Sequence, residues 1–192
     1  MRRCLALFLL FPMVFFCSCR SADRAMQETL DFRTTVLQSG GCNFDAAVTA
    51  EAGECSYDFC MTCAYDGEDA HFTVTEPENI SGICGRVRNE QADIDFEDIA
   101  LEFPVESELV SPVKTGKLLG DAWARDYISA AGADGELCRM TAKHGYDEDE
   151  LTVDTWLREK KPVYAEISYN GKTLLSCKID NFCFGFIERE KN

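Results

Sequence analysis

The sequence predicts an α+β domain: a curved antiparallel sheet or unclosed β-barrel of about nine to eleven strands, with two helices across its concave face. Three observations lead to this fold class. Most of the chain alternates between apolar and polar residues, which is typical of strands with one buried face. Residues 21–39 and 111–131 instead repeat apolar side chains at helical spacing. The order helix, strands, helix, strands favours an antiparallel sheet whose helices gather on one face.

A basic start, a short apolar run and a cysteine after a small residue mark the N-terminus. Arg2 and Arg3 precede the apolar run Leu5–Phe16, and Ser18 stands directly before Cys19. This pattern is typical of an export signal that ends at a lipid attachment site. The run is shorter than the roughly 20 apolar residues that a membrane-spanning helix needs.

We therefore expect residues 1–18 to be a signal peptide and residues 19–192 to form a single domain. A lipid on Cys19 would hold this domain at the extracytoplasmic face of the cell membrane, because two acyl chains suffice for stable anchoring. The residues leave two alternatives open: lipid attachment at Cys17, although Phe15 and Phe16 before it fit worse, and an ordinary cleaved secretory signal.

The first helix is expected at residues 21–39. Apolar side chains recur from Ala22 to Leu37, Ser21 suits the N-cap, and Gly40 suits the end of the helix. One face of this helix is apolar and must pack against another element.

A hairpin follows, with strands at residues 42–51 and 54–66 and a tight turn at Ala52-Gly53. This turn sets Glu51 opposite Glu54. It also places five pairs on one apolar face: Ala50–Cys55, Val48–Tyr57, Ala46–Phe59, Phe44–Met61 and Cys42–Cys63. A disulfide between Cys42 and Cys63 is geometrically allowed in this register.

The rest of the body alternates between strands and one further helix. Strands are expected at 69–76, 82–89, 92–96 and 99–103, and again at 136–144, 150–158, 162–170, 172–180 and 182–187. Asn170-Gly171 is a strong hairpin signal that sets Tyr169 opposite Lys172 and Ile167 opposite Leu174.

The second helix, residues 111–131, starts at Ser111-Pro112, where proline suits the first helical position. Gly116 and Gly120 each weaken it by roughly 1 kcal/mol relative to alanine. The helix therefore needs tertiary support.

The formal net charge of −15 narrows the classes of partner. Such a chain is repelled by phosphate, so nucleic-acid binding is disfavoured. Anionic lipid headgroups repel it as well, which leaves the lipid as its hold on the membrane. A basic protein partner fits this charge.

Eight of the eleven cysteines lie in the body, after Cys4, Cys17 and Cys19. They are Cys42, Cys55, Cys60, Cys63, Cys84, Cys138, Cys177 and Cys183. Their even number permits disulfides in an exported domain, but spacing does not give the pairing. The alternative is that they are small apolar side chains of the core.

No catalytic residue, metal site or cofactor motif stands out. Cys60 and Cys63 have C-x-x-C spacing, but residues three apart on a strand point to opposite faces, which disfavours redox or metal use. His71 and His144 are the only histidines, and no nucleophile motif surrounds a serine. The acidic turn 147–150 lacks the spaced ligands of an EF-hand loop.

Aromatic residues form the most suggestive set. The candidates for the lining of an apolar cavity are Phe44, Tyr57, Phe59, Trp123, Tyr127 and Trp156. An ordinary filled core is the alternative, because sequence does not show whether a space is occupied.

A lipid-type Cys19, a helix ending in Val36-Leu37-Gln38, the 42–65 hairpin, the Ser111-Pro112 helix start and the closing run 163–172 follow one another along the chain. In this order they resemble the LolA/LolB lipoprotein-carrier fold, and especially the small LolA-like lipoproteins of Gram-positive bacteria, among them the spore-germination type. The resemblance implies an unclosed antiparallel barrel that cups helices over a hydrophobic cavity. In that family the carriers hold acyl chains, while the germination type works as a binding partner.

We therefore expect a non-enzymatic, membrane-anchored lipoprotein that binds an envelope protein partner. A carrier of an acyl chain or other apolar ligand is the first alternative, and it predicts a large dry cavity. An envelope hydrolase is the second, and it predicts a histidine within reach of a nucleophile and an acid.

Overall fold

The structure is a computed structural model. It describes residues 22–53, 55–89, 91–96, 99–104, 112–145 and 150–187. The expected signal peptide and Cys19 lie outside the described residues. Among the helices that are described, none is long and apolar enough to cross a membrane.

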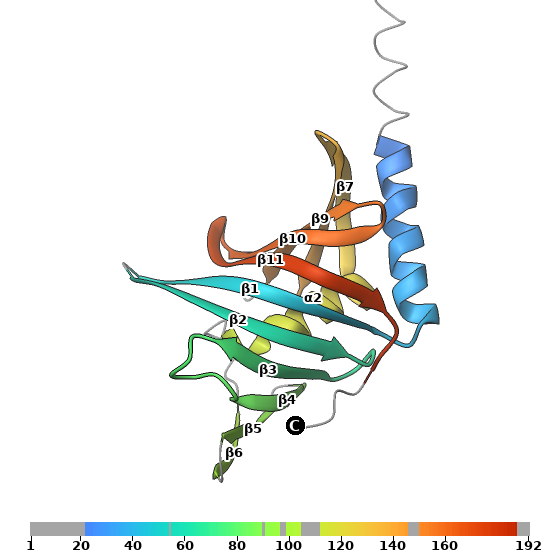
Figure 1. Ribbon diagram of the computed structural model, residues 1–192. Coiled ribbons are helices and arrows are strands. Elements are labelled where there is room, and N and C mark those ends of the chain that lie inside the picture. The colour runs from blue at the N-terminus through green and yellow to red at the C-terminus, as the bar shows by residue number, and fades with distance from the viewer. Residues whose placement is uncertain are drawn as a thin grey trace, which may run out of the picture.

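Within the described residues, eleven strands form one antiparallel sheet in the order β6-β5-β4-β3-β2-β1-β11-β10-β9-β8-β7 (Figure 1). The strands are β1 Cys42–Ala52, β2 Cys55–Tyr65, β3 Ala70–Glu76, β4 Cys84–Arg88, β5 Gln91–Phe96, β6 Ile99–Pro104, β7 Tyr127–Asp134, β8 Leu137–His144, β9 Leu151–Arg158, β10 Lys161–Tyr169 and β11 Lys172–Phe184. Because β1 pairs with β11 in the middle of the sheet, each half of the chain builds a meander outward from the centre.

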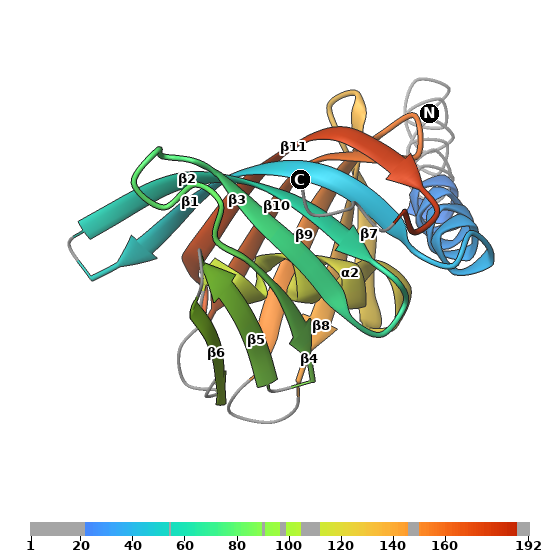
Figure 2. The same ribbon diagram turned by 60° about the horizontal axis from the view of Figure 1, so that its bottom comes forward.

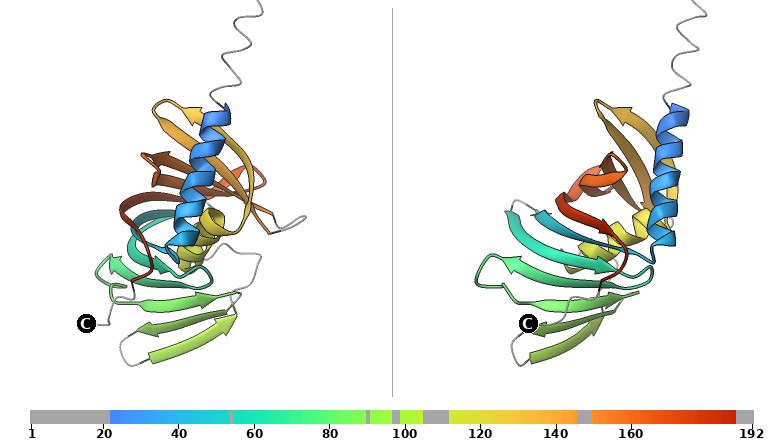
Figure 3. Two further views of the ribbon diagram at one scale, coloured as in Figure 1. Left: turned by 90° about the vertical axis from the view of Figure 1, so that its right-hand side faces the viewer. Right: turned by 45° about the vertical axis from the view of Figure 1, so that its right-hand side comes forward.

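The sheet is not closed, and it curves around a short helix (Figures 2 and 3). This helix, α2 (Thr115–Ala124), follows the 3-10 turn η1 (Pro112–Lys114) and crosses the concave face. The N-terminal helix, residues 22–38, lies beside α2. The Arg33 guanidinium joins the two helices by donating hydrogen bonds to the carbonyls of Ala122 (2.9 Å) and Trp123 (3.1 Å). The predicted α+β half-barrel with two helices is confirmed.

Alternation along the strands gives the sheet an inner face toward α2 and an outer face away from it. On β1, Ala46 and Val48 are buried on the inner face, whereas Ala47 between them is exposed on the outer face. The core therefore lies between the sheet and the two helices, as period-two patterning requires.

Two glycines let α2 lie directly on β2. A Cβ atom at Gly120 would come within 2.3 Å of the Tyr65 ring, and one at Gly116 would lie 3.1 Å from the Cys63 sulfur. All residues of α2 are buried. The helix thus has the tertiary support that its glycines require.

The buried polar groups of α2 pair with one another and with β2. The Lys117 ammonium forms an ion pair with the Asp121 carboxylate one turn later, and the Tyr65 hydroxyl donates to the same carboxylate at 2.8 Å. Burial, together with the Asp121 charge, raises the pKa of Tyr65. These charges are compensated in place, as a buried ion pair must be.

The predicted register of the first hairpin is wrong by two residues. Ala52 pairs with Cys55, so the turn starts at Gly53, whose φ of +66° favours glycine. The same residues still face inward, because a shift of two keeps every side chain on its face. Cys42 now lies opposite Tyr65, and Cys63 lies opposite Phe44.

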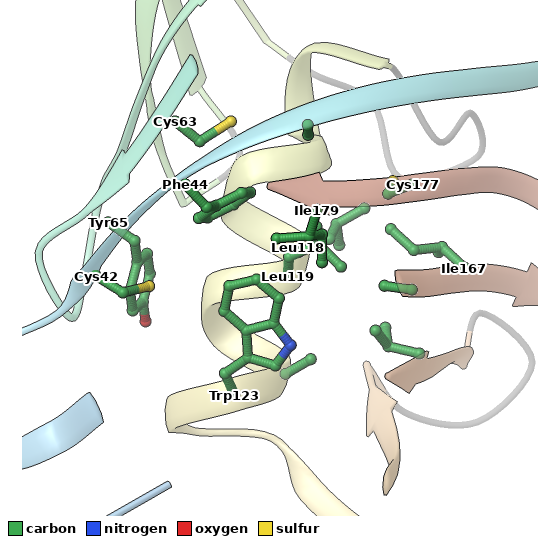
Figure 4. Packing of buried hydrophobic residues seen from close by; sticks show 14 of the residues in the cluster. Cys42, Phe44, Cys63, Tyr65, Leu118, Leu119, Trp123, Ile167, Cys177 and Ile179 are labelled. Carbon is green, nitrogen blue, oxygen red and sulfur yellow. The ribbon is translucent and has the colours of Figure 1, made fainter. Parts of the chain in front are cut away.

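The register that would allow a Cys42–Cys63 disulfide across the hairpin is therefore not the observed one. Both cysteines are buried, and Figure 4 shows them well apart. The other six body cysteines are free thiols.

The second helix is shorter than predicted. It ends at Ala124, where the backbone N–H groups of Arg125 and Asp126 both donate to the Asp121 carbonyl. The segment predicted to continue it is β7, because its backbone pairs with β8 instead.

The predicted strands 172–180 and 182–187 are one strand, β11. Asn181, with φ of +51°, lies at an irregularity in the β1–β11 pairing, so the strand continues past it. At the other end Tyr169 pairs with Lys172 as predicted, but a bulge sets Ile167 opposite Leu175 rather than Leu174.

Candidate functional site

The structure does not bring the six predicted cavity residues together. Phe44 and Trp123 meet in the core with ring centroids 5.0 Å apart, and both are fully buried (Figure 4). Phe59 packs at the margin of the same cluster. Phe44 and Trp123 are core side chains, whereas Phe59 is only partly buried and also borders the hollow described below.

The other three face solvent to different degrees. Tyr57 is 59% exposed, since the β1–β2 hairpin extends past α2 (Figure 2). Tyr127 is 73% exposed on the edge strand β7. Trp156 lies on the outer face of β9, beside Tyr164 of β10 at a ring distance of 5.3 Å.

Around Trp123, described side chains of the protein itself fill the inner face. The Trp123 ring packs edge-on against Phe32, Phe44 and Phe182, and its Nε1 donates to the Thr155 hydroxyl at 3.0 Å. Leu119 is also fully buried. An indole whose ring and N–H are both satisfied is a structural residue.

A hollow of about 620 Å³ lies on the opposite, outer face, and we call it the outer groove. Its lining residues are Ala47, Val48, Thr49, Asp58, Phe59, Cys60, Glu76, Pro77, Glu78, Tyr164, Ser176 and Lys178. Such a volume falls in the range of ligand pockets, roughly 300 to 1,000 Å³.

Strand pairing builds the groove as two rows across β2, β1, β11 and β10. The first row is Cys60, Ala47, Lys178 and Tyr164. The second row is Asp58, Thr49 and Ser176, and Glu166 of β10 continues this row outside the lining. The methyl group of Ala47 leaves the centre of the first row low, and the turn after β3 adds Pro77 and Glu78 at one end.

Hydrogen bonds fix the polar side chains of these rows. The Thr49 hydroxyl donates to the Asp58 carboxylate at 2.6 Å, and the Tyr164 hydroxyl donates to Glu166 at 2.9 Å. On β11, the Lys178 ammonium donates to the Asp180 carboxylate at 2.8 Å, which raises the pKa of Lys178.

One thiol and one phenol of the groove, Cys60 and Tyr164, are held in their neutral forms. Burial, then the hydrogen bond and charge of Glu76, raise the pKa of the Cys60 thiol, whose sulfur lies 3.5 Å from that carboxylate. Partial burial and the bond to Glu166 raise the pKa of Tyr164. A protonated thiol and phenol are poor nucleophiles.

The histidines lie outside the groove and apart from each other. His144, at the end of β8, has its Nδ1 2.9 Å from the Asp126 carboxylate. His71, on β3, packs its ring against Phe186. The strand order separates β3 from β8 across the sheet. Among the described residues, His144 thus has the acid partner of the hydrolase pattern.

The C-x-x-C thiols diverge as predicted. Cys60 points to the outer groove, whereas Cys63 is buried on the inner face opposite Phe44. Sequence reasoning missed the groove itself, since its rows join residues of four strands that only the register places side by side.

No family model and no curated protein sequence matches this chain. Among solved structures, it is similar to a LolA superfamily protein from Nitrosomonas europaea, with 8% identity, coverage of 84% of this chain and 94% of that protein, and a TM-score of 0.47. It is also similar to the lipoprotein LppX from Mycobacterium tuberculosis, with 11% identity, coverage of 84% and 96%, and a TM-score of 0.38. At these identities, both are similarities of fold alone.

Proposed function

We propose that this chain is a non-enzymatic binding protein of the cell envelope, anchored by a lipid on Cys19, that binds a partner protein on the outer face of its half-barrel. One observation carries the proposal: the inner face is filled by core side chains, while the outer groove is open to solvent. Binding therefore falls to the outer surface.

Carriage of an acyl chain fits the inner face poorly. A carrier needs unfilled apolar space beneath its helices, and there Phe44, Leu119 and Trp123 are fully buried against one another. An entering chain would have to displace such side chains, and emptying a core position of a large residue costs about 3–5 kcal/mol. This comparison favours a protein partner over an apolar ligand.

Catalysis fits the groove poorly as well. A hydrolase needs a nucleophile beside a base, and the thiol and phenol of the groove are both held protonated. Neither histidine belongs to the lining. We therefore assign the groove to recognition.

The proposed location rests on the N-terminal sequence. Ser18-Cys19 follows a short apolar run with a basic start, and Arg20 and Ser21 separate Cys19 from the first described helical residue. A lipid on Cys19 would tether the folded domain closely to the membrane.

The anchor is tested on the full chain with Cys19→Ala and the matched variant Cys17→Ala. We expect Cys19→Ala to lose incorporation of a labelled fatty acid and to leave the membrane fraction, and Cys17→Ala to retain both. Loss from Cys17→Ala instead, or retention of label by Cys19→Ala, would overturn this assignment.

Carriage is tested with Trp156→Phe, which leaves Trp123 as the only tryptophan of the chain. Titration with palmitate or with phosphatidylglycerol vesicles should leave the Trp123 emission unchanged, because its surroundings are already filled. A saturable shift of that emission would show entry of lipid into the core and would replace the proposal by carriage.

Binding of a protein is tested by photo-cross-linking in native membranes. A benzophenone amino acid is placed singly at exposed positions on three parts of the surface: Gln27, Gln91 and Lys178. We expect a discrete protein adduct from at least one position on the sheet. The absence of a specific adduct from all three would contradict the proposed function.

A further inference from the structure

The two ends of the outer groove differ in charge. Asp58, Glu76 and Glu78 gather where β2 meets the turn after β3. At the opposite end lies Tyr164, whose hydroxyl donates to Glu166, a carboxylate outside the lining. The one cation of the lining, Lys178, forms an ion pair with Asp180 on the same strand, so the net field of the groove is negative.

The carboxylate end is not neutralised from within the groove. Asp58 accepts a hydrogen bond from Thr49, and Glu76 accepts one from the Cys60 thiol, and both of these donors are uncharged. Glu78 is exposed at the rim. The chain as a whole carries a formal charge of −15, which adds to the attraction of a cation and repels an anion.

The floor between the two ends has small side chains, namely Ala47, Thr49 and Ser176, beside Lys178. Ala47 is exposed at the centre of this floor. In the first row, Lys178 lies between Ala47 and Tyr164. Four neighbouring strands about 4.8 Å apart give a row of about 14 Å, which matches about four residues of extended peptide.

We propose that the outer groove binds an extended cationic segment of the partner protein, with a lysine or arginine at Asp58, Glu76 and Glu78 and an apolar side chain on Ala47 and Tyr164. This inference rests on the proposed function, because it gives the chemistry of the partner that the function requires. An anionic peptide would meet three carboxylates, and an acyl chain would cover them without a counter-charge, which is unfavourable.

The first test uses the labelled peptide Lys-Leu-Lys-Leu and its matched anionic peptide Glu-Leu-Glu-Leu. We expect the full chain to bind the cationic peptide, more weakly as salt is raised, and not to bind the anionic peptide. The double variant Asp58→Asn/Glu76→Gln should weaken binding by roughly tenfold, since two ion pairs are removed.

The control is Glu136→Gln/Glu159→Gln, which removes the same charge from two exposed turns away from the groove. It should change the affinity by less than about twofold, because those carboxylates act only through the screened overall charge. An equal loss in both double variants would overturn the groove as the site. Equally tight binding of spermine would replace the peptide by a small polyamine, and no binding of the cationic peptide would refute the inference.

The second test separates this inference from the proposed function. With the benzophenone at Lys178 on the rim of the groove, we expect a protein adduct in native membranes that excess Lys-Leu-Lys-Leu abolishes. An adduct from Gln91 but not from Lys178 would keep the proposed function and overturn the groove. No adduct from any position would overturn both.

Discussion

The two tryptophans of the chain report on the two faces of the same sheet. Trp123, on α2, is packed by three phenylalanine rings on the inner side and donates its N–H to a threonine. Trp156, on the outer side, lies under the Arg139 guanidinium at 5.1 Å and donates its N–H to Asp134 at 2.7 Å. Aromatic character alone therefore does not mark a cavity, because the neighbours decide the role.

The two faces are stabilised in different ways. The inner face depends on close packing, where each buried contact is protected from water. The outer face depends on ion pairs such as Arg139–Asp154 at 2.7 Å, whose arginine is 46% exposed and therefore screened. Substitutions on the outer face are thus expected to disturb the fold little, which leaves that face open to a binding function.

The largest expected effect is the difference in stability between variants of the two tryptophans. Trp123→Ala should lower the free energy of unfolding by about 3–5 kcal/mol, since it empties a filled core position. Trp156→Ala should lower it by about 1 kcal/mol, the contribution of an exposed cation–π contact. Urea unfolding of both variants measures the difference, and equal losses would show that the outer tryptophan belongs to the core.

Local patterns predicted the elements, and tertiary pairing decided the rest. Alternation located the strands, and parity alone already places Trp156 outside, since the buried Val153 and Leu157 have the opposite parity. Tyr57 has the same parity as Phe59 but is exposed, because the hairpin extends past α2. The pattern of either strand alone does not predict how far the hairpin extends.

The outer groove could not be predicted from the pattern of single strands, for a similar reason. Ala47 and Lys178 become neighbours only through the pairing of β1 with β11, which joins the two ends of the domain. No turn fixes that pairing, whereas the Asn170-Gly171 turn fixed Tyr169 against Lys172. The helix at 111–131 was overextended because β8 offered the backbone of Tyr127–Asp134 better pairing than a further helical turn.

The second prediction compares the stability of variants at a glycine of α2 and a glycine of β7. Gly120→Ala should lower the free energy of unfolding by about 1–3 kcal/mol, because its Cβ would overlap the Tyr65 ring and force α2 away from β2. Gly132→Ala on β7 is the control, since nothing lies within 4 Å of its Cβ position. Equal stability of the Gly120→Ala variant and the unmodified chain would refute the close contact.

The last prediction concerns two thiols of the inner face at alkaline pH. Burial raises the pKa of Cys42 and of Cys177 to about 12 in the folded protein. In an unfolded chain the pKa of a cysteine is about 8.5. Above that pH the unfolded state therefore loses protons that the folded state retains. Stability should therefore fall as pH rises from about 9 toward 12, by about 1.4 kcal/mol per pH unit for each thiol.

The measurement is urea unfolding under reducing conditions at stepped pH. Cys177→Ala should flatten the alkaline slope by one thiol's share, whatever it does to stability at neutral pH. Cys183→Ala is the matched control, because Cys183 lies on the same strand but is exposed. A slope that Cys177→Ala leaves unchanged would mean that water reaches this thiol in the folded protein, and the inner face would then be less tightly filled than its packing implies.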